Sequence, residues 1–270
     1  MKNLKDNPDA GFSLIEVVVA IVMIFFFTNV ALQMLVISGI FKQKATQYTT
    51  AINLIQQDME KIKSAADTYS FPTTSAAAVG VTTVTLNPPT GLATANFLTA
   101  TNKVQFSNSS DIYTISSISS NVITISSALK KAVTASNYAL SKTSCDLKTA
   151  DSASTNKMAT YFDTSLPITA TATGNTAYTV NGTTYSYYPV TGTPTNLKGQ
   201  YYWLLRNETV STDAPYNILK INYVVQANKL PNTTPAPLST NAPTILDPAY
   251  TLATSSTEVI PYASLQCPSK

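Results

Sequence analysis

Residues 11–27 decide the fold, and they are Gly11-Phe12-Ser13-Leu14-Ile15-Glu16 followed by Val17-Val18-Val19-Ala20-Ile21-Val22-Met23-Ile24-Phe25-Phe26-Phe27. Apolar residues dominate the thirty positions 12–41, and no proline occurs between Pro8 and Pro72. At a rise of about 1.5 Å per residue such a helix is about 45 Å long, which exceeds the roughly 30 Å of a bilayer core. The stretch therefore predicts a membrane-spanning helix over residues 12–41.

The order of the N-terminal segments differs from that of a secretory signal peptide. In a signal peptide a small-residue cleavage site follows the apolar run. Here the short polar stretch 1–11 precedes the run, and no Ala-x-Ala site follows it. We therefore expect residues 1–11 to be a leader, and the apolar segment to stay in the mature protein as an anchor.

Residues 11–16 and the apolar helix after them closely resemble the processing site of type IV prepilins and type II secretion pseudopilins; the resemblance covers about residues 11–40. It implies cleavage between Gly11 and Phe12 by a prepilin peptidase, which also N-methylates Phe12, and a role for Glu16 in assembly. The implied partners are other pilin or pseudopilin subunits, this peptidase and methyltransferase, and a pilus assembly platform. The implied location is the inner membrane, single-pass with the head in the periplasm, and then an extracellular or periplasmic filament.

Glu16 has two interpretations. A carboxylate within an apolar run costs several kcal/mol unless it is paired or near the interface. Near a helix N-terminus it is favoured by the helix dipole and can reach the headgroups. The resemblance implies instead that Glu16 pairs with the α-amine of Phe12 in a neighbouring subunit. Both can hold in turn, the first in the membrane and the second after extraction.

The helix is predicted to continue to residue 66, giving a stem over residues 12–66. Apolar residues recur there in steps of four and three, at Phe41, Ala45, Tyr48, Ile52, Ile55, Met59, Ile62 and Ala66. This spacing predicts an apolar stripe that packs on the subunit's own β head. Polar residues, Asp58 among them, are assigned to the other faces.

After residue 66 the pattern changes to one of short strands. Five apolar or alternating segments follow at roughly ten-residue spacing, at residues 79–86, 103–106, 112–115, 122–125 and 138–140. They predict a small antiparallel barrel or sandwich, a β-rich insertion over residues 67–143. The first half of a single larger head is the alternative.

Residues 144–270 are predicted to form the pilin β-head with a C-terminal loop, which makes the fold class α+β. Residues 201–206 and 218–225 predict a hairpin, and the Pro-, Thr- and Ala-rich chain past residue 230 predicts an extended surface segment. A cluster of aromatic residues in this part of the chain has two interpretations, a binding surface or, as is more common for aromatics in strands, a filled core. Its members are Tyr185, Tyr187, Tyr188, Tyr201, Tyr202 and Trp203.

The chain has two cysteines, Cys145 and Cys267, and no histidine. Zinc spacing is absent and a Cys–His nucleophile is excluded, so we expect no metal and no cofactor. In an exported protein the pair indicates one structural disulfide, the alternative being two buried free thiols.

Composition narrows the function classes further. Charged residues make up 11% of the chain and the net charge is +3 without a long basic run, so no specific nucleic acid is predicted as a partner. No phosphate loop, nucleophile elbow or carboxylate cluster indicates an enzyme.

The leading hypothesis is a minor pilin that primes a type IV pilus or stands at its tip. The long head favours it, as does the absence of the stem proline of many major pilins, whose place Gln33 takes. A type II secretion pseudopilin, or a tip-displayed adhesin or ligand-binding module, is the alternative.

Overall fold

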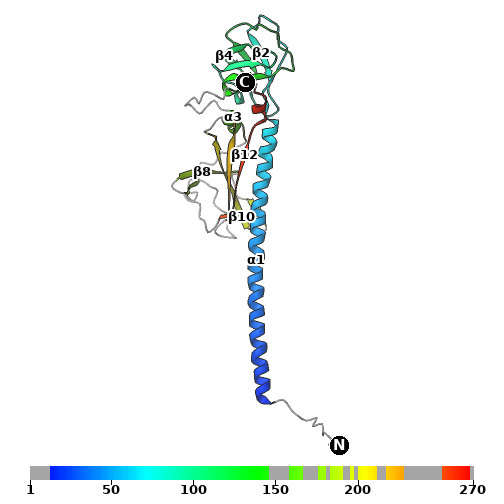
Figure 1. The fold of residues 1–270 in the computed structure, drawn as a ribbon, viewed down its shortest axis with the longest axis vertical. Coiled ribbons are helices and arrows are strands. Elements are labelled where there is room, and N and C mark those ends of the chain that lie inside the picture. The colour runs from blue at the N-terminus through cyan, green and yellow to red at the C-terminus, as the bar shows by residue number, and fades with distance from the viewer. Residues whose placement is uncertain are drawn as a thin grey trace, which may run out of the picture. The chain divides into compact units, whose positions relative to one another are not determined.

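A computed structural model describes residues 13–145, 158–166, 176–180, 183–190, 195–197, 200–211, 217–227 and 251–267. The longest element is the helix α1 (Leu14–Thr68), coloured blue to cyan in Figure 1. The chain divides into two compact units, residues 1–50 and residues 51–270, and α1 continues through the boundary. Together with the antiparallel sheets described below, this helix confirms the α+β class.

The part of α1 in the second unit buries one face. The buried residues follow each other in steps of four, three, four and four, which places them on one side of the helix: Ala51, Ile55, Asp58, Ile62 and Ala66. The predicted stripe is therefore partly wrong. Met59 is only partly buried and Tyr48 is exposed, whereas Asp58 lies on the buried face and not on the polar one.

The first sheet comes directly after α1. Its strands follow the order β1-β2-β5-β4-β3-β6, and all neighbours are antiparallel. Their bounds are β1 (Thr73–Thr74), β2 (Thr83–Asn87), β3 (Lys103–Phe106), β4 (Ile112–Ser119), β5 (Val122–Ile125) and β6 (Ala139–Ser141), with the 3₁₀ helix η1 (Thr94–Asn96) between β2 and β3. The five predicted strands are present.

This sheet closes on itself. An antiparallel bridge joins Thr73, in β1, to Tyr138, next to β6. The backbone N–H of Thr74 donates to the carbonyl of Asn137 at 2.8 Å, and that of Ala139 donates to Pro72 at 2.9 Å. Because the two edge strands meet, the sheet closes into a small barrel, which is one of the two forms predicted. Strand β2 begins later than predicted, after a turn in which Gly80 has φ +91°.

The second sheet holds the predicted hairpin. Its order is β12-β11-β10-β8-β7, and β9 also pairs with β10. The bounds are β7 (Thr176–Val180), β8 (Thr183–Pro189), β9 (Thr195–Leu197), β10 (Gln200–Val210), β11 (Leu219–Ala227) and β12 (Thr251–Val259). Strands β10 and β11 pair antiparallel from Tyr202↔Ala227 to Val210↔Leu219, which confirms the hairpin.

Strand β12 corrects the prediction of an extended surface segment past residue 230 for residues 251–267, whereas residues 231–250 lie outside the described residues. It pairs with β11 from Leu219↔Val259 to Gln226↔Thr251 and adds an edge strand to the sheet. A short helix, α4 (Tyr262–Leu265), follows it. The chain after residue 250 is therefore an integral part of the head.

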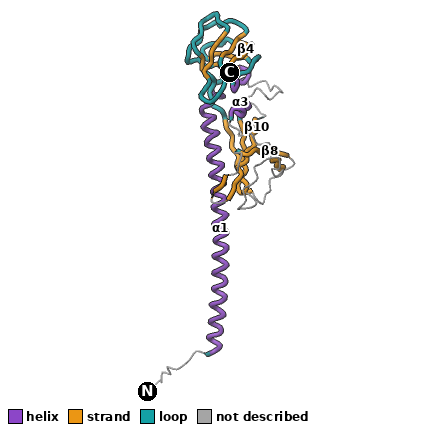
Figure 2. Tube along the Cα trace, turned by 180° about the vertical axis from the view of Figure 1, so that it is seen from behind, coloured by secondary structure: helices purple, strands orange, loops and turns teal. Residues whose placement is uncertain are grey.

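The helix α3 (Met158–Ser165) lies between the two sheets, which Figure 2 shows as separate groups of orange strands. It contacts η1 on one side and β10 and β11 on the other. The buried residues of α1, the barrel, α3 and the second sheet belong to one hydrophobic cluster. Tyr187, Trp203, Leu205 and Val224 form a second cluster. Tyr202 belongs to the first cluster, so three members of the predicted aromatic group fill the core.

Candidate functional site

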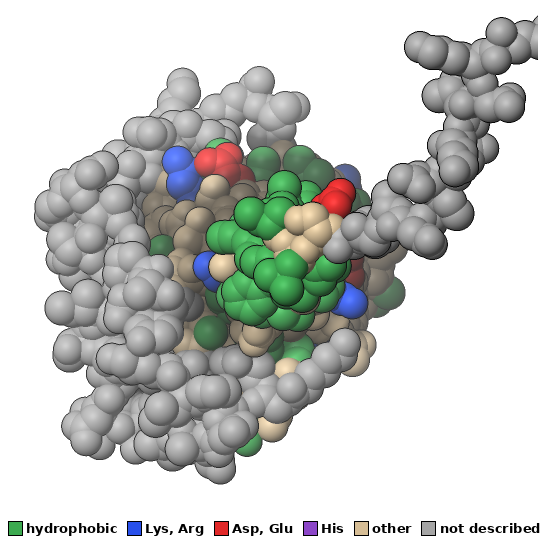
Figure 3. Space-filling model, turned by 90° about the horizontal axis from the view of Figure 1, so that it is seen from below, with side chains coloured by type: hydrophobic (Ala, Val, Ile, Leu, Met, Phe, Trp, Pro, Cys, Tyr) green, Lys and Arg blue, Asp and Glu red, His purple; other side chains and the backbone are tan. Residues whose placement is uncertain are grey.

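The N-terminal part of α1 is an exposed apolar surface. Residues 13–46 are all exposed, and the most apolar window of α1 has a mean hydropathy of 2.5 and no buried residue. Figure 3 shows hydrophobic side chains gathered around the N-terminal end of the helix. Soluble monomers rarely leave apolar surface of this extent in water. By length and composition α1 is able to cross a membrane, which suggests a membrane-anchored protein.

Glu16 differs from two other polar residues of this surface, Thr28 and Asn29. The hydroxyl of Thr28 donates to the carbonyl of Ile24 at 2.7 Å, and the amide of Asn29 donates to the carbonyl of Phe25 at 3.0 Å. Those two side chains are therefore satisfied by their own helix. Glu16 lies in the first turn of α1, and within the described residues no hydrogen bond or ion pair of its side chain is found. Its carboxylate is thus available to an external cation.

The remaining predicted processing residues, Gly11 and Phe12, lie outside the described residues. The first described residue after them is Ser13. Its carbonyl accepts hydrogen bonds from the backbone N–H groups of Glu16 at 2.8 Å and Val17 at 3.2 Å, which begin the helix. Within the described residues the helix begins at Leu14.

A buried ionic cluster, which we call the Arg206 network, joins α1 to the second sheet. Nη1 of Arg206, on β10, lies 3.0 Å from Oδ2 of Asp58 on α1. Its Nε lies 2.5 Å from Oε1 of Glu208, two residues along the same strand. The three side chains are 8–10% exposed. Asp163, on α3, adjoins Glu208, and the hydroxyl of Tyr223, on β11, faces Asp58.

The Arg206 network shifts the ionisation of its members. Burial raises the pKa of Glu208 to about 8, against the opposing pull of Arg206 and with a further rise from Asp163. Burial also raises the pKa of Asp163, while a hydrogen bond from Glu208 and the charge of Arg206 lower it. The pKa of Tyr223 is raised mainly by burial and then by the Asp58 carboxylate beside it. Glu208 is therefore the member that holds a proton near neutral pH.

These four charged residues were not predicted as a buried cluster, although one signal was present in the sequence. Asp58 follows Ile55 by three residues and precedes Ile62 by four, so its spacing matches the buried face. A lone carboxylate at such a position requires a buried partner. That partner, Arg206, is 148 residues away in sequence, and only the pairing of α1 with β10 identifies it.

Asp58→Asn is expected to destabilise the protein by about 1–3 kcal/mol, because Arg206 keeps a hydrogen-bond acceptor but loses a buried charge partner. Urea denaturation of the full chain in detergent micelles measures this, with fluorescence of Trp203, the only tryptophan, as the reporter. Asp67→Asn, at an exposed position of the same helix, is the matched control and should change stability by less than about 0.5 kcal/mol. Equal effects of the two substitutions would contradict a structural role for the pair.

The two cysteines form the disulfide that the sequence indicated. Cys145 ends α2 (Lys142–Cys145), just after the barrel, and Cys267 follows α4. The Cα atoms are 5.4 Å apart across a separation of 122 residues. The bond therefore closes a loop that contains α3 and every strand of the second sheet.

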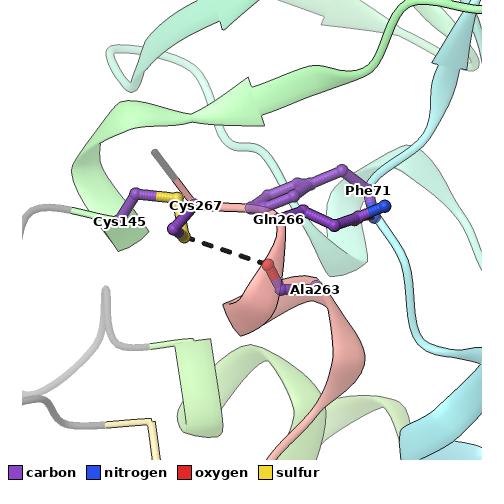
Figure 4. The surroundings of a disulfide bond; sticks show 5 residues. All are labelled: Phe71, Cys145, Ala263, Gln266 and Cys267. Atoms are coloured by element: carbon purple, nitrogen blue, oxygen red, sulfur yellow. Dashed lines mark hydrogen bonds between the residues drawn. A yellow bond between two sulfur atoms is a disulfide. The ribbon is translucent and has the colours of Figure 1, made fainter. Parts of the chain in front are cut away.

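The C-terminal segment also holds the connection between α1 and the barrel, as Figure 4 shows around the disulfide. The side-chain oxygen of Gln266 accepts a hydrogen bond from the backbone N–H of Phe71 at 2.8 Å. The backbone N–H of Ala263 donates to the carbonyl of Tyr69 at 2.7 Å, and Sγ of Cys267 lies 3.9 Å from the carbonyl oxygen of Ala263. Residues 263–267 thus connect Tyr69 and Phe71, which precede the barrel, to Cys145, which follows it.

Comparisons of the chain with protein-family models, with curated proteins and with solved structures give no match. The architecture itself is compatible with a pilin-like α+β fold, since a long apolar N-terminal helix continues into a segment that packs on an antiparallel sheet.

Proposed function

We propose that this chain is a minor pilin-like structural subunit, which prepilin peptidase trims and which assembles through its N-terminal helix into a type IV pilus. The observation that carries the proposal is the exposed apolar part of α1 with a single unpaired carboxylate, Glu16, in its first turn. We propose that two successive environments cover this surface, a membrane and then other subunits.

In the membrane, the lipid covers the apolar side chains and Glu16 stays near the headgroups. After extraction, the same surface must be covered by other chains, because exposing it to water costs roughly 25 cal/mol for each Å² of apolar area. The apolar helices of other pilin subunits match it in length and chemistry. A carboxylate buried among them is tolerated only with a cationic partner.

Cleavage supplies this cation. Cutting between Gly11 and Phe12 creates an α-amine on Phe12, four positions before Glu16. Within one helix both groups lie at the same end, so the amine of one subunit and the Glu16 carboxylate of a neighbour can neutralise each other. The proposed partners are therefore other pilin subunits, the peptidase and an assembly platform, first in the inner membrane and then in the filament.

A tip-displayed adhesin is less well supported by the described residues. Every aromatic ring between residues 69 and 141 is buried or half-buried, namely Tyr69, Phe71, Phe97, Phe106, Tyr113 and Tyr138. Carbohydrate recognition by stacking needs exposed rings. A type II secretion pseudopilin would use the same N-terminal chemistry, and the filament with which the tagged subunit copurifies distinguishes it from a pilus subunit.

Glu16→Gln is expected to insert and mature normally but to lose at least tenfold in recovery from sheared filaments. The amide keeps the shape of the side chain and removes the charge that neutralises the neighbouring amine. Immunoblots of the membrane and filament fractions measure both steps. Thr28→Val, which changes a polar residue already bonded to its own helix, is the control and should assemble like wild type. Normal assembly of Glu16→Gln would exclude the proposed charge pairing.

A further inference from the structure

The Arg206 network contains more acids than bases. One guanidinium faces three carboxyl groups, those of Asp58 on α1, Asp163 on α3 and Glu208 on β10. Within the described part of the chain, the further titratable group that faces them is the hydroxyl of Tyr223 on β11. Full ionisation of the acids would leave two uncompensated negative charges in a buried site. Such a state is costly, so at least one carboxyl group keeps a proton.

The position of Glu208 identifies which group that is. Its carboxyl adjoins that of Asp163 within hydrogen-bonding reach. Two ionised carboxylates are acceptors only and repel each other, whereas one proton between them makes a short, charge-assisted hydrogen bond. Asp58 has the Nη1 of Arg206 as its own donor at 3.0 Å. The shared proton therefore lies between Glu208 and Asp163.

This hydrogen bond links α3 to the second sheet. On the barrel side of α3, the hydroxyl of Tyr161 accepts from the side-chain amide of Asn102 at 3.1 Å, and Phe162 packs edge-on against Tyr69 with ring centroids 5.2 Å apart. The helix thus connects the two sheets, and the Asp163–Glu208 pair is a polar contact on one side of that connection.

We propose that Asp163 and Glu208 form a proton-dependent latch, in which one shared proton fastens α3 to β10 and loss of the proton in alkaline medium loosens α3. The latch does not depend on the assignment as a pilin, since it involves only residues of the head. If the head is displayed at the cell surface, which rests on the proposed function, the latch couples the stability of the head to external pH.

The direction of the pH effect follows from the raised pKa. The folded state holds the proton of Glu208 up to about pH 8, whereas the unfolded chain releases it near its ordinary value of 4.5. The stabilisation is thus complete below about pH 4.5, and it is lost progressively as the pH rises to about 8. Tyr223 stays protonated throughout this range, because burial raises its pKa.

Hydrogen–deuterium exchange of the α3 peptide in the full chain, in detergent micelles at pH 6 and pH 8.5, tests the latch. After correction for the intrinsic exchange rate, wild-type protection is expected to fall at least tenfold between the two pH values. Glu208→Gln and Asp163→Asn replace the shared proton with an amide donor, so protection in both should be independent of pH. Glu60→Gln, exposed on α1, is the matched control and should behave like wild type.

Two results would overturn the latch: unchanged wild-type protection between the two pH values, or an equal fall in wild type and Glu208→Gln. If Glu208→Gln does not fold, Asp163→Asn decides alone, since its amide donates to the Glu208 carboxylate without a titrating proton. A fall in Asp163→Asn as large as that in wild type then assigns the pH dependence to other groups.

Discussion

Gly11→Val is expected to abolish removal of residues 1–11 while leaving membrane insertion intact. The resemblance to prepilins implies a peptidase that accepts glycine at this position, where a β-branched side chain adds bulk next to the scissile bond. Insertion depends on the apolar part of α1, which the substitution does not touch. Intact-mass measurement of the membrane-extracted protein, from cells that contain a prepilin peptidase, should show only the full-length chain.

The control for this experiment is Ala10→Val, which places the same side chain one residue earlier. It should be trimmed to a large extent, and both variants should remain in the membrane fraction. Trimming of Gly11→Val at the wild-type rate would show that the proposed cleavage position is wrong.

Removing the disulfide is expected to produce the largest loss of stability. Cys145→Ala with Cys267→Ala opens a loop of 122 residues, for which the chain-entropy account gives roughly 4–5 kcal/mol. Urea denaturation followed by Trp203 fluorescence measures the change, and wild type reduced with an excess of a dithiol should match the double variant. A change of less than about 1 kcal/mol would show that other contacts hold the C-terminus.

Hydrogen exchange of individual backbone N–H groups provides a further check on the role of the disulfide. The backbone N–H groups of Phe71 and Ala263 are hydrogen-bonded in the junction next to the bond. They should exchange faster in the double variant, whereas the N–H of Val225, in the central strand β11, should keep its protection at matched global stability. A uniform loss of exchange protection across the head would contradict a local effect of the disulfide on the junction.

An element was predicted accurately from the sequence where its hydrophobic pattern lies within a few consecutive residues. Helix α1 and strands β3, β5, β10 and β11 carry their periodicity within a few residues, and their positions were predicted closely. Strand β12 carries almost none, because only Ala253 and Val259 are buried along its nine residues. Its pairing with β11 defines it as a strand, and this contact is absent from any local window.

The buried contacts between distant segments show the same limit. The disulfide could be predicted, because two cysteines allow one pairing, but the sequence does not show that it lies beside Tyr69 and Phe71. The Arg206 network could not be predicted, since its members come from α1, α3 and β10. For the N-terminal site, Glu16 and its apolar surroundings are local features, and α1 places the carboxylate in its first turn.

The central claim is that this chain matures as a pilin does, and mass spectrometry of the N-terminus of protein from cells with a prepilin peptidase tests it most directly. The account predicts a chain that begins at Phe12 and carries a methyl group on its α-amine. A chain that still begins at Met1, or one cut beyond Ala66 so that the apolar helix is lost, would contradict it.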